Sequence, residues 1–315
     1  MMEDTRTTPY ANSVFEQPWW LDIVAPGKWG EAVVKNGEEV VARLPYVLKG
    51  KNITMPSLTQ TLGPWIKPEY RGMRPGNTQL SLQKELIAEL LSQLPRHSNF
   101  SMCFDSANEY ILPYRWLGYR YEPSFSYRIK NLDDIDAVHA NFNKTAKKNI
   151  RRAEKSISIS HEEDADLLID IMEKTFAHQG RSYPISKQLV RKIVEDTVFT
   201  NHGKMFVARD EKDKIHACSF LVYDEASSYA LLGGSDPEYR NSGAKSLVWK
   251  EEIDFASTRS KYFDFEGSNI ESIENFVRQF GGERVINYLV SKESVAKEFA
   301  NILKPRIKKI IGYKN

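Results

Sequence analysis

The chain is poor in the residues that build covalent or metal cross-links. It has two cysteines, Cys103 and Cys218, and six histidines, with no metal-ligand spacing among them. One pair of cysteines is no disulfide framework, and zinc sites need closely spaced Cys and His ligands. We therefore expect two buried free thiols in a reducing cytoplasm and no metal site.

Long apolar runs and a strong net charge are also missing. No stretch approaches the roughly 18 uninterrupted apolar residues of a membrane span, and the N-terminus lacks the positive start and apolar run of a secretory signal. The 315 residues carry a net charge of +2, with 41% hydrophobic and 27% charged residues. This composition is typical of a soluble globular protein longer than one average domain, and it leaves the oligomeric state open.

One tetrapeptide occurs twice. Pro-Glu-Tyr-Arg stands at 68–71 and again at 237–240, each time after a glycine-bearing extended segment. Patterns downstream of both copies predict the same order of helix, strand, helix ending at a glycine, and strand. An internal repeat of this kind indicates two halves of similar design.

The second half is the longer one. Residues 131–155 have a mostly helical pattern, and two further amphipathic helices are expected before the strands of this half. We place the boundary near residue 130, which gives domains of residues 1–130 and 131–315.

Two patterns of the second half bear on a site. From Lys245 onward, apolar residues at helical spacing leave Lys250, Glu251 and Glu252 on the polar side. In residues 261–267 the side chains alternate, so Tyr262, Asp264 and Glu266 are expected to share one face of a strand. Gly267 then ends that strand.

This order of elements, with Arg240-Asn241-Ser242-Gly243-Ala244 at a helix start, resembles the GNAT acyltransferase fold. The paired arrangement resembles the FemAB-like branch, whose members carry two such folds and attach acyl or aminoacyl groups to amines. Three stretches are similar to that branch: residues 15–30, 144–155 and 263–283. The resemblance implies an α/β (α+β) protein of two tandem GNAT-like domains, each with a mixed, mostly antiparallel sheet flanked by helices, the first domain being degenerate.

The turn at 240–245 has a physical rationale as a phosphate site. Helix N-termini expose unpaired N–H groups and the positive end of the helix dipole, so a pyrophosphate can bind there, with Arg240 adding charge. The resemblance implies the pyrophosphate of coenzyme A, although Lys245 stands where the family has Gly or Ala. A solvent-facing structural turn is the alternative. The candidate donor-binding residues are Gly234, Ser235, Arg240, Ser242, Gly243, Ala244 and Lys245.

The first copy of the tetrapeptide differs at this point. Extra residues, including Pro75, separate Arg71 from its helix. We therefore predict that the first half binds no acyl donor.

Acyl transfer to an amine requires a neutral amine and a polarised carbonyl, whereas a covalent nucleophile is optional. The chain has no Gly-x-Ser-x-Gly elbow, which favours direct attack. Glu266 is the candidate base, with Asp264 second and Tyr239 as a further catalytic candidate; Ser268 and Asn269 are candidate substrate contacts. The alternative role for Glu266 is helix capping or pairing with a lysine.

Residues 144–155 are strongly basic. Six cations recur at three- and four-residue steps, and Arg151 and Arg152 among them are candidate substrate contacts. Such a helix can follow phosphates, here of aminoacyl-tRNA, of a nucleotide-linked precursor or of coenzyme A, or it can be a solvated face. The basic C-terminal run, residues 304–314, could contact RNA or an anionic membrane surface, or it can be a solvated face.

Three functions follow. The leading one is an N-acyltransferase that moves an acyl group, with acyl-CoA as donor, to a primary amine of a sugar, an amino acid or a cell-envelope precursor. The second is an aminoacyltransferase that uses aminoacyl-tRNA and a peptidoglycan precursor. The third is a binding protein that keeps the fold without the chemistry, because fold alone does not fix function.

Overall fold

The computed structural model describes residues 6–71, 79–267 and 271–293. The elements of the first half are η1 (Val14–Glu16), α1 (Pro18–Val24), β1 (Trp29–Asn36), β2 (Glu39–Lys49), β3 (Asn52–Thr54), β4 (Trp65–Ile66), η2 (Pro68–Tyr70), α2 (Gln79–Ser92), β5 (Asn99–Phe104), α3 (Leu112–Trp116) and β6 (Arg120–Ile129). Those of the second half are α4 (Ile135–Ala140), α5 (Lys144–Ala153), β7 (Ile157–Glu162), α6 (Ala165–His178), α7 (Lys187–Phe199), β8 (Gly203–Asp210), β9 (Ile215–Tyr223), β10 (Ser227–Ser235), η3 (Pro237–Tyr239), α8 (Ala244–Ser257), β11 (Tyr262–Asp264), α9 (Glu271–Val277), η4 (Arg278–Phe280) and β12 (Glu283–Lys292).

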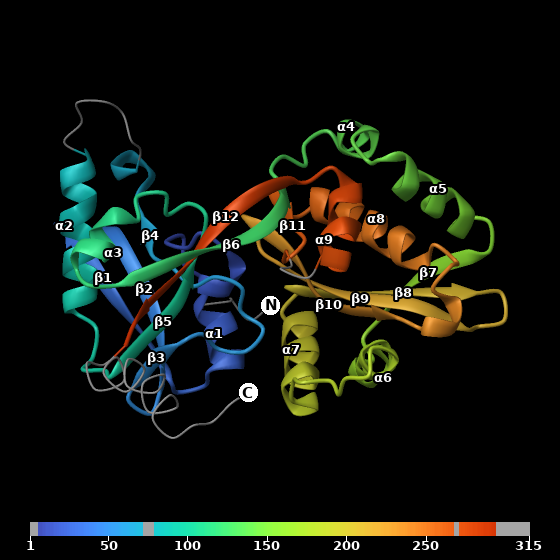
Figure 1. The fold of residues 1–315 in the computed structure, drawn as a ribbon, viewed down its shortest axis with the longest axis horizontal. Helices are drawn as coiled ribbons and strands as arrows, with labels where there is room; N and C mark the ends of the chain where they lie inside the picture. The colour runs from blue at the N-terminus through green and yellow to red at the C-terminus, as the bar shows by residue number, and fades with distance from the viewer. Residues whose placement is uncertain (1–5, 72–78, 268–270, 294–315) are drawn as a thin grey trace, which may run out of the picture.

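The strands of the described residues join in one mixed sheet through both halves. Its order is β1-β2-β3-β5-β12-β6-β11-β10-β9-β8-β7, with β4 paired to β2. Figure 1 shows β1 to β5 on one side of the molecule, β7 to β10 on the other, and β6 and β12 crossing between them. The predicted α/β fold with a mixed, mostly antiparallel sheet and flanking helices is confirmed.

The internal repeat is also present in the fold. Both copies of Pro-Glu-Tyr form a 3₁₀ turn, η2 and η3, and the order helix, strand, helix, strand follows each of them. The extra helices of the second half are α6 and α7. The helical stretch after residue 130 divides into α4 and α5, because Asn143 caps α5 by accepting a hydrogen bond from the Ala146 N–H.

The last described strand, β12, lies among the strands of the first half. β12 lies between β5 and β6, with Tyr288 opposite Phe104 and Ile286 opposite Phe125. In turn β6 pairs with β11, where Arg128 faces Asp264. Each half therefore contributes strands that border the other, while the domain boundary near residue 130 stays a prediction.

Apolar side chains form two cores. One runs through both halves, from Phe15 and Trp20 of the first to Val190 and Tyr229 of the second. The other lies between α8 and the upper face of β8 and β9, and α5 packs on it through Ala146, Ile150 and Ala153. In Figure 1, α8 and α5 lie above the strands of the second half and α6 and α7 below them.

Three expectations need correction. Glu252, predicted on the polar side of its helix, is fully buried in α8. Cys218 is buried as expected, but Cys103 is only partly buried. The strand predicted over 261–267 ends at Asp264, since the Glu266 backbone has φ +59° and leaves the extended conformation.

Two further points concern membranes and the basic tail. Among the helices of the described residues, none is both long and apolar enough to cross a membrane. The C-terminal basic run lies outside the described residues, so its alternatives stay open.

Candidate active site

The turn between η3 and α8 is held tightly against α5. Gly243 caps α8 with φ +88°, and a Cβ built on it would lie 2.3 Å from the Asn149 carbonyl oxygen. Only glycine fits this conformation and this close approach. Arg152 Nε donates to the Ser242 carbonyl at 3.3 Å, while Arg240 is exposed to solvent. The turn therefore offers a free guanidinium beside a helix N-terminus.

A cavity opens where two parallel strands separate. β11 pairs with β10 only along Ser227–Tyr229, and the pairing of β10 with β9 shifts register between Ala230 and Leu232. The cavity between the diverging strands has a volume of about 190 Å³. Its lining includes Gly233, Gly234, Lys245 and Glu266. We call this space the splayed-strand cavity.

Lys245 and Glu266 both face this cavity, and removal from water favours the neutral form of each. The surrounding protein, and secondly the charge of Asp264, raise the pKa of Glu266 well above its ordinary value. Lys245 is exposed as a whole residue, but the protein atoms around its ammonium remove part of its hydration and lower its pKa. That ammonium lies over two aromatic rings, 5.5 Å from the Trp249 centroid and 4.8 Å from that of Phe276.

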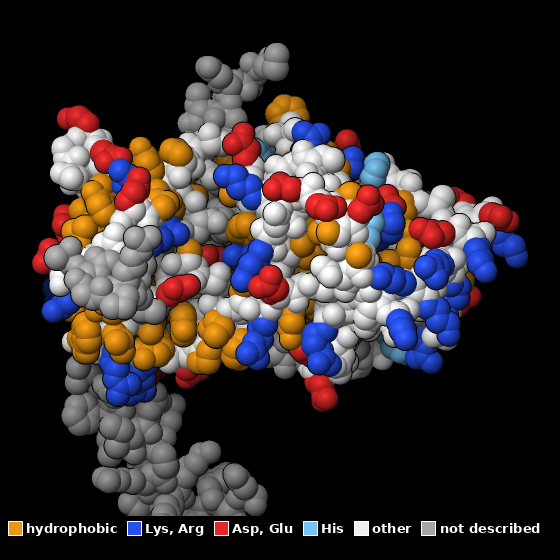
Figure 2. Space-filling view, turned by 90° about the horizontal axis from the view of Figure 1, so that it is seen from above, with side chains coloured by type: hydrophobic (Ala, Val, Ile, Leu, Met, Phe, Trp, Pro, Cys, Tyr) orange, Lys and Arg blue, Asp and Glu red, His pale blue; other side chains and the backbone are white. Residues whose placement is uncertain are grey.

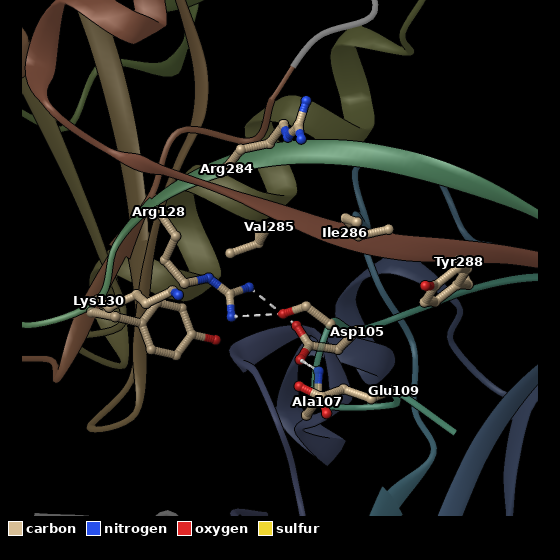
Figure 3. Close-up of a pocket in the computed structure, with 11 residues that line it drawn as sticks. Asp105, Ala107, Glu109, Arg128, Lys130, Arg284, Val285, Ile286 and Tyr288 are labelled. Atoms are coloured by element: carbon tan, nitrogen blue, oxygen red, sulfur yellow. Dashed lines mark hydrogen bonds and ion pairs between the residues drawn. The ribbon is translucent and has the colours of Figure 1, made fainter. Parts of the chain in front are cut away.

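A second cavity lies between the halves, around Arg128. This guanidinium donates to Asp264 at 3.0 Å and to Asp105 at 3.1 Å, and it stacks 4.1 Å from the Tyr262 ring centroid. Figure 3 shows Arg128 pointing toward Asp105 from β6. The cavity has a volume of about 460 Å³ and is also lined by Glu109, Lys130, Arg284 and Tyr288.

The buried charge network fixes the role of Asp264. Its carboxylate accepts from Ser126 Oγ, from Arg128 and from the Glu266 N–H, and the side chain is fully buried. Burial raises its pKa, an effect that Arg128 opposes. Asp264 does not line the splayed-strand cavity, so it positions the segment that carries Glu266 rather than facing a substrate there.

The other predicted residues are spread around this site. Tyr239 stacks on His216 with ring centroids 4.1 Å apart and does not line the splayed-strand cavity. The Ser235 hydroxyl is buried without a hydrogen bond, and its N–H donates to Thr175. Gly234 lines the cavity. Ser268 and Asn269 lie outside the described residues.

Arg151 and Arg152 belong to a basic surface. The basic face of α5 consists of Lys144, Lys147, Lys148, Arg151, Arg152 and Lys155, which line one surface hollow of about 600 Å³. Figure 2 shows Lys and Arg side chains gathered over this part of the second half. Arg152 links the face to the turn before α8.

Sequence reasoning missed two features. Glu252 was overlooked because its helix position looked polar; both of its carboxylate oxygens are buried without a hydrogen bond. Asp105 was overlooked as well, although Phe104-Asp105 stands at the end of β5 as Phe265-Glu266 stands just after β11. That correspondence within the repeat was the available signal.

In the first half, Arg71 is bound within the protein. Its guanidinium donates to the Ile66 carbonyl and to Asn12 Oδ1. This matches a structural role for Arg71, whereas its counterpart Arg240 is exposed. The residues between 72 and 78, which were expected to interrupt the turn, lie outside the described residues, so the absence of a donor site there stays a prediction.

Comparisons with known proteins agree with this geometry. Residues 140–270 match the family model described as an acetyltransferase (GNAT) domain. The crystal structure of FemX is similar over 87% of this chain and 91% of its own, with a TM-score of 0.62 and 11% identity. L-PGS from Bacillus licheniformis is similar over 91% of this chain and 90% of its own, with a TM-score of 0.51 and 12% identity.

A third solved structure points the same way. The C-terminal domain of a putative lysylphosphatidylglycerol synthetase from Agrobacterium fabrum is similar over 90% of this chain and 89% of its own length, with a TM-score of 0.52 and 12% identity. No curated protein matches the sequence. At these identities the structures show the fold alone. Residues 140–270 are thus similar to a GNAT acetyltransferase domain, and the chain as a whole shares its fold with FemX.

Proposed function

We propose that this protein is an N-acyltransferase that moves an acyl group from coenzyme A to a primary amine of a sugar, an amino acid or a cell-envelope precursor. The GNAT domain covers the turn, the splayed-strand cavity and α5. We place the reaction in the cytoplasm, in keeping with the two free cysteines.

One observation carries the proposal: the splayed-strand cavity joins the donor turn to an ionisable carboxyl. Lys245, in the first turn of α8, and Glu266, after β11, line the same space. A donor whose pyrophosphate lies at the turn can extend its acyl end along the edge of β10 that β11 leaves unpaired. Backbone N–H groups on such an edge can hold the oxygen on which negative charge develops.

Glu266 is suited to the proton transfer. The amine nitrogen forms a bond to the acyl carbon, the carbon–sulfur bond breaks to release the coenzyme A thiolate, and the amine proton passes to the Glu266 carboxylate. A carboxylate whose pKa is raised is a stronger proton acceptor than an ordinary glutamate. Tyr239 stacks on the His216 ring, so we assign to it a role in supporting the donor turn.

The test of this proposal is Glu266→Gln, assayed with acetyl-CoA and a panel of primary amines by the release of free thiol. We expect kcat to fall about 10²- to 10⁴-fold, the usual contribution of a general base. Glu225→Gln, at an exposed turn of the same half, is the matched control and should stay active. Full turnover by the Glu266 variant would remove Glu266 from the mechanism.

The pH profile gives a second readout. Only ionised Glu266 accepts a proton, so kcat/KM should fall as the pH drops through its pKa. Because burial raises that pKa, the acid limb should lie above the ordinary range of a glutamate. An acid limb at the pH of an ordinary glutamate would count against Glu266 as the base.

A second candidate donor is aminoacyl-tRNA with a peptidoglycan precursor as acceptor. The similarity to structures titled FemX and lysylphosphatidylglycerol synthetase, together with the basic face of α5, favours it. Thermal stabilisation separates the donors, because a ligand at a hundredfold over its Kd adds about 2.7 kcal/mol to the free energy of unfolding. Stabilisation by aminoacyl-tRNA and none by acetyl-CoA would reject the leading proposal.

A further inference from the structure

The basic face of α5 is an uncompensated concentration of positive charge. Among the described residues, none of its six cations lies within ion-pair distance of an acidic side chain. Like charges on neighbouring turns of a helix repel one another. An anionic ligand would relieve this repulsion.

The face meets the donor turn directly. The Asn149 carbonyl lies against Gly243, and Arg152 donates both to Asn149 Oδ1 at 2.9 Å and to the Ser242 carbonyl at 3.3 Å. Lys148 and Lys155 stand four residues before and three residues after Arg152, so they border it on the same side of the helix and of the turn that follows it.

The turn by itself uses some of its backbone donors internally. The Ala244 N–H donates to Ser242 Oγ at 3.2 Å, and the Ser242 N–H donates to the Tyr239 carbonyl at 2.9 Å. The Ala244 N–H is one of the groups that a helix N-terminus offers to an anion. Side chains from outside the turn would have to supply the missing contacts, and α5 is the neighbouring source.

The burial of α5 argues against a membrane as the ligand. Helices that lie on a bilayer insert an apolar face between the lipids. The apolar residues of α5, namely Ala146, Ile150 and Ala153, are buried in the second core. Nothing apolar on this face is left to insert.

We propose that the basic face of α5 binds the ribose 3′-phosphate of coenzyme A, next to the pyrophosphate at the donor turn. The two phosphate groups are attached to the same ribose, so a pyrophosphate at the turn brings the 3′-phosphate to the adjacent helix. This inference rests on the proposed function and assigns to Lys148, Arg151 and Lys155 the recognition of the donor nucleotide.

The test compares coenzyme A with dephospho-coenzyme A, which lacks only the 3′-phosphate, by calorimetric titration of the full chain. We expect the wild-type protein to bind coenzyme A at least tenfold more tightly. In the triple variant Lys148→Ala, Arg151→Ala, Lys155→Ala this ratio should approach one. Lys35→Ala, an exposed lysine of β1, should keep the wild-type ratio, and circular dichroism checks that all variants fold.

The possible results are distinct. Binding of both compounds with equal affinity by the wild-type protein overturns this inference but leaves the proposed function standing. Binding of neither rejects the proposed function as well. A short single-stranded RNA that binds more tightly than coenzyme A, with an affinity that falls steeply with salt and is lost in the triple variant, would overturn the 3′-phosphate assignment in favour of an RNA site.

Discussion

Glu252 shows how burial alters the chemistry of a single residue. Its carboxyl lies wholly inside the protein without a hydrogen bond to either oxygen. Burial raises its pKa to about 8, although the charge of Lys245 opposes the shift. The group is therefore mainly protonated in the folded protein at neutral pH.

This shift predicts a loss of stability as the pH rises. Between the unfolded pKa of about 4.5 and the folded pKa of about 8 the folded state binds the extra proton, so the free energy of unfolding falls through this range. The loss is on the order of 3 to 5 kcal/mol. Glu252→Gln should remove much of this slope, as measured by urea denaturation at several pH values.

The neighbouring residue provides the control. Glu251 is partly exposed and pairs with Lys250 at 3.2 Å, so Glu251→Gln should leave the pH slope in place. If the slope persists in the Glu252 variant, another group must cause it.

At the scale of elements, the contact between α5 and the start of α8 depends on one glycine. Gly243→Ala should lower the free energy of unfolding by about 2 to 4 kcal/mol, because the left-handed conformation and the Asn149 carbonyl both oppose a Cβ. Gly50→Ala is the matched control. Gly50 also has positive φ, but a Cβ there meets no atom within 4 Å, so its cost should be about 1 kcal/mol.

Chemical denaturation of the two variants checks this prediction. Equal losses of the free energy of unfolding in the two variants would show that α5 can move away from the turn at little cost. The donor affinity provides a second readout, since a displaced α5 should weaken the binding of coenzyme A in the Gly243 variant alone.

At the scale of the whole molecule, the exchange of strands makes the halves interdependent. Val290 of β12 is fully buried in the core that also holds Phe100 and Met102 of β5. A fragment of residues 1–130 lacks β12, so β5 and β6 lose the strand that lies between them. We expect this fragment to be unfolded on its own.

Circular dichroism and amide exchange of the fragment test this expectation. The full chain should unfold in one cooperative transition, with tryptophan fluorescence and far-UV circular dichroism giving the same midpoint. A folded fragment, or two separate transitions, would show that the halves are independent domains.

The sequence predicted the elements well because they depend on local patterns. The repeated tetrapeptide, the helical spacing of apolar residues and the alternation of side chains in strands act within a few residues. The site was predicted less completely. Glu266 and Lys245 were singled out, but the periodicity of α8 placed Glu252 on the wrong side, and strand alternation wrongly gave Asp264 and Glu266 a common face.

The sequence by itself therefore determined the order of elements, the two-part repeat and the glycine turn, since each rests on backbone preferences and hydrophobic spacing of neighbouring residues. Only the tertiary structure decided that β12 joins the first half, that Arg128 binds Asp105 and Asp264, and that α5 lies against the donor turn. These features depend on packing between residues far apart in the chain, and no local pattern encodes which distant partner a buried charge or a strand edge will meet.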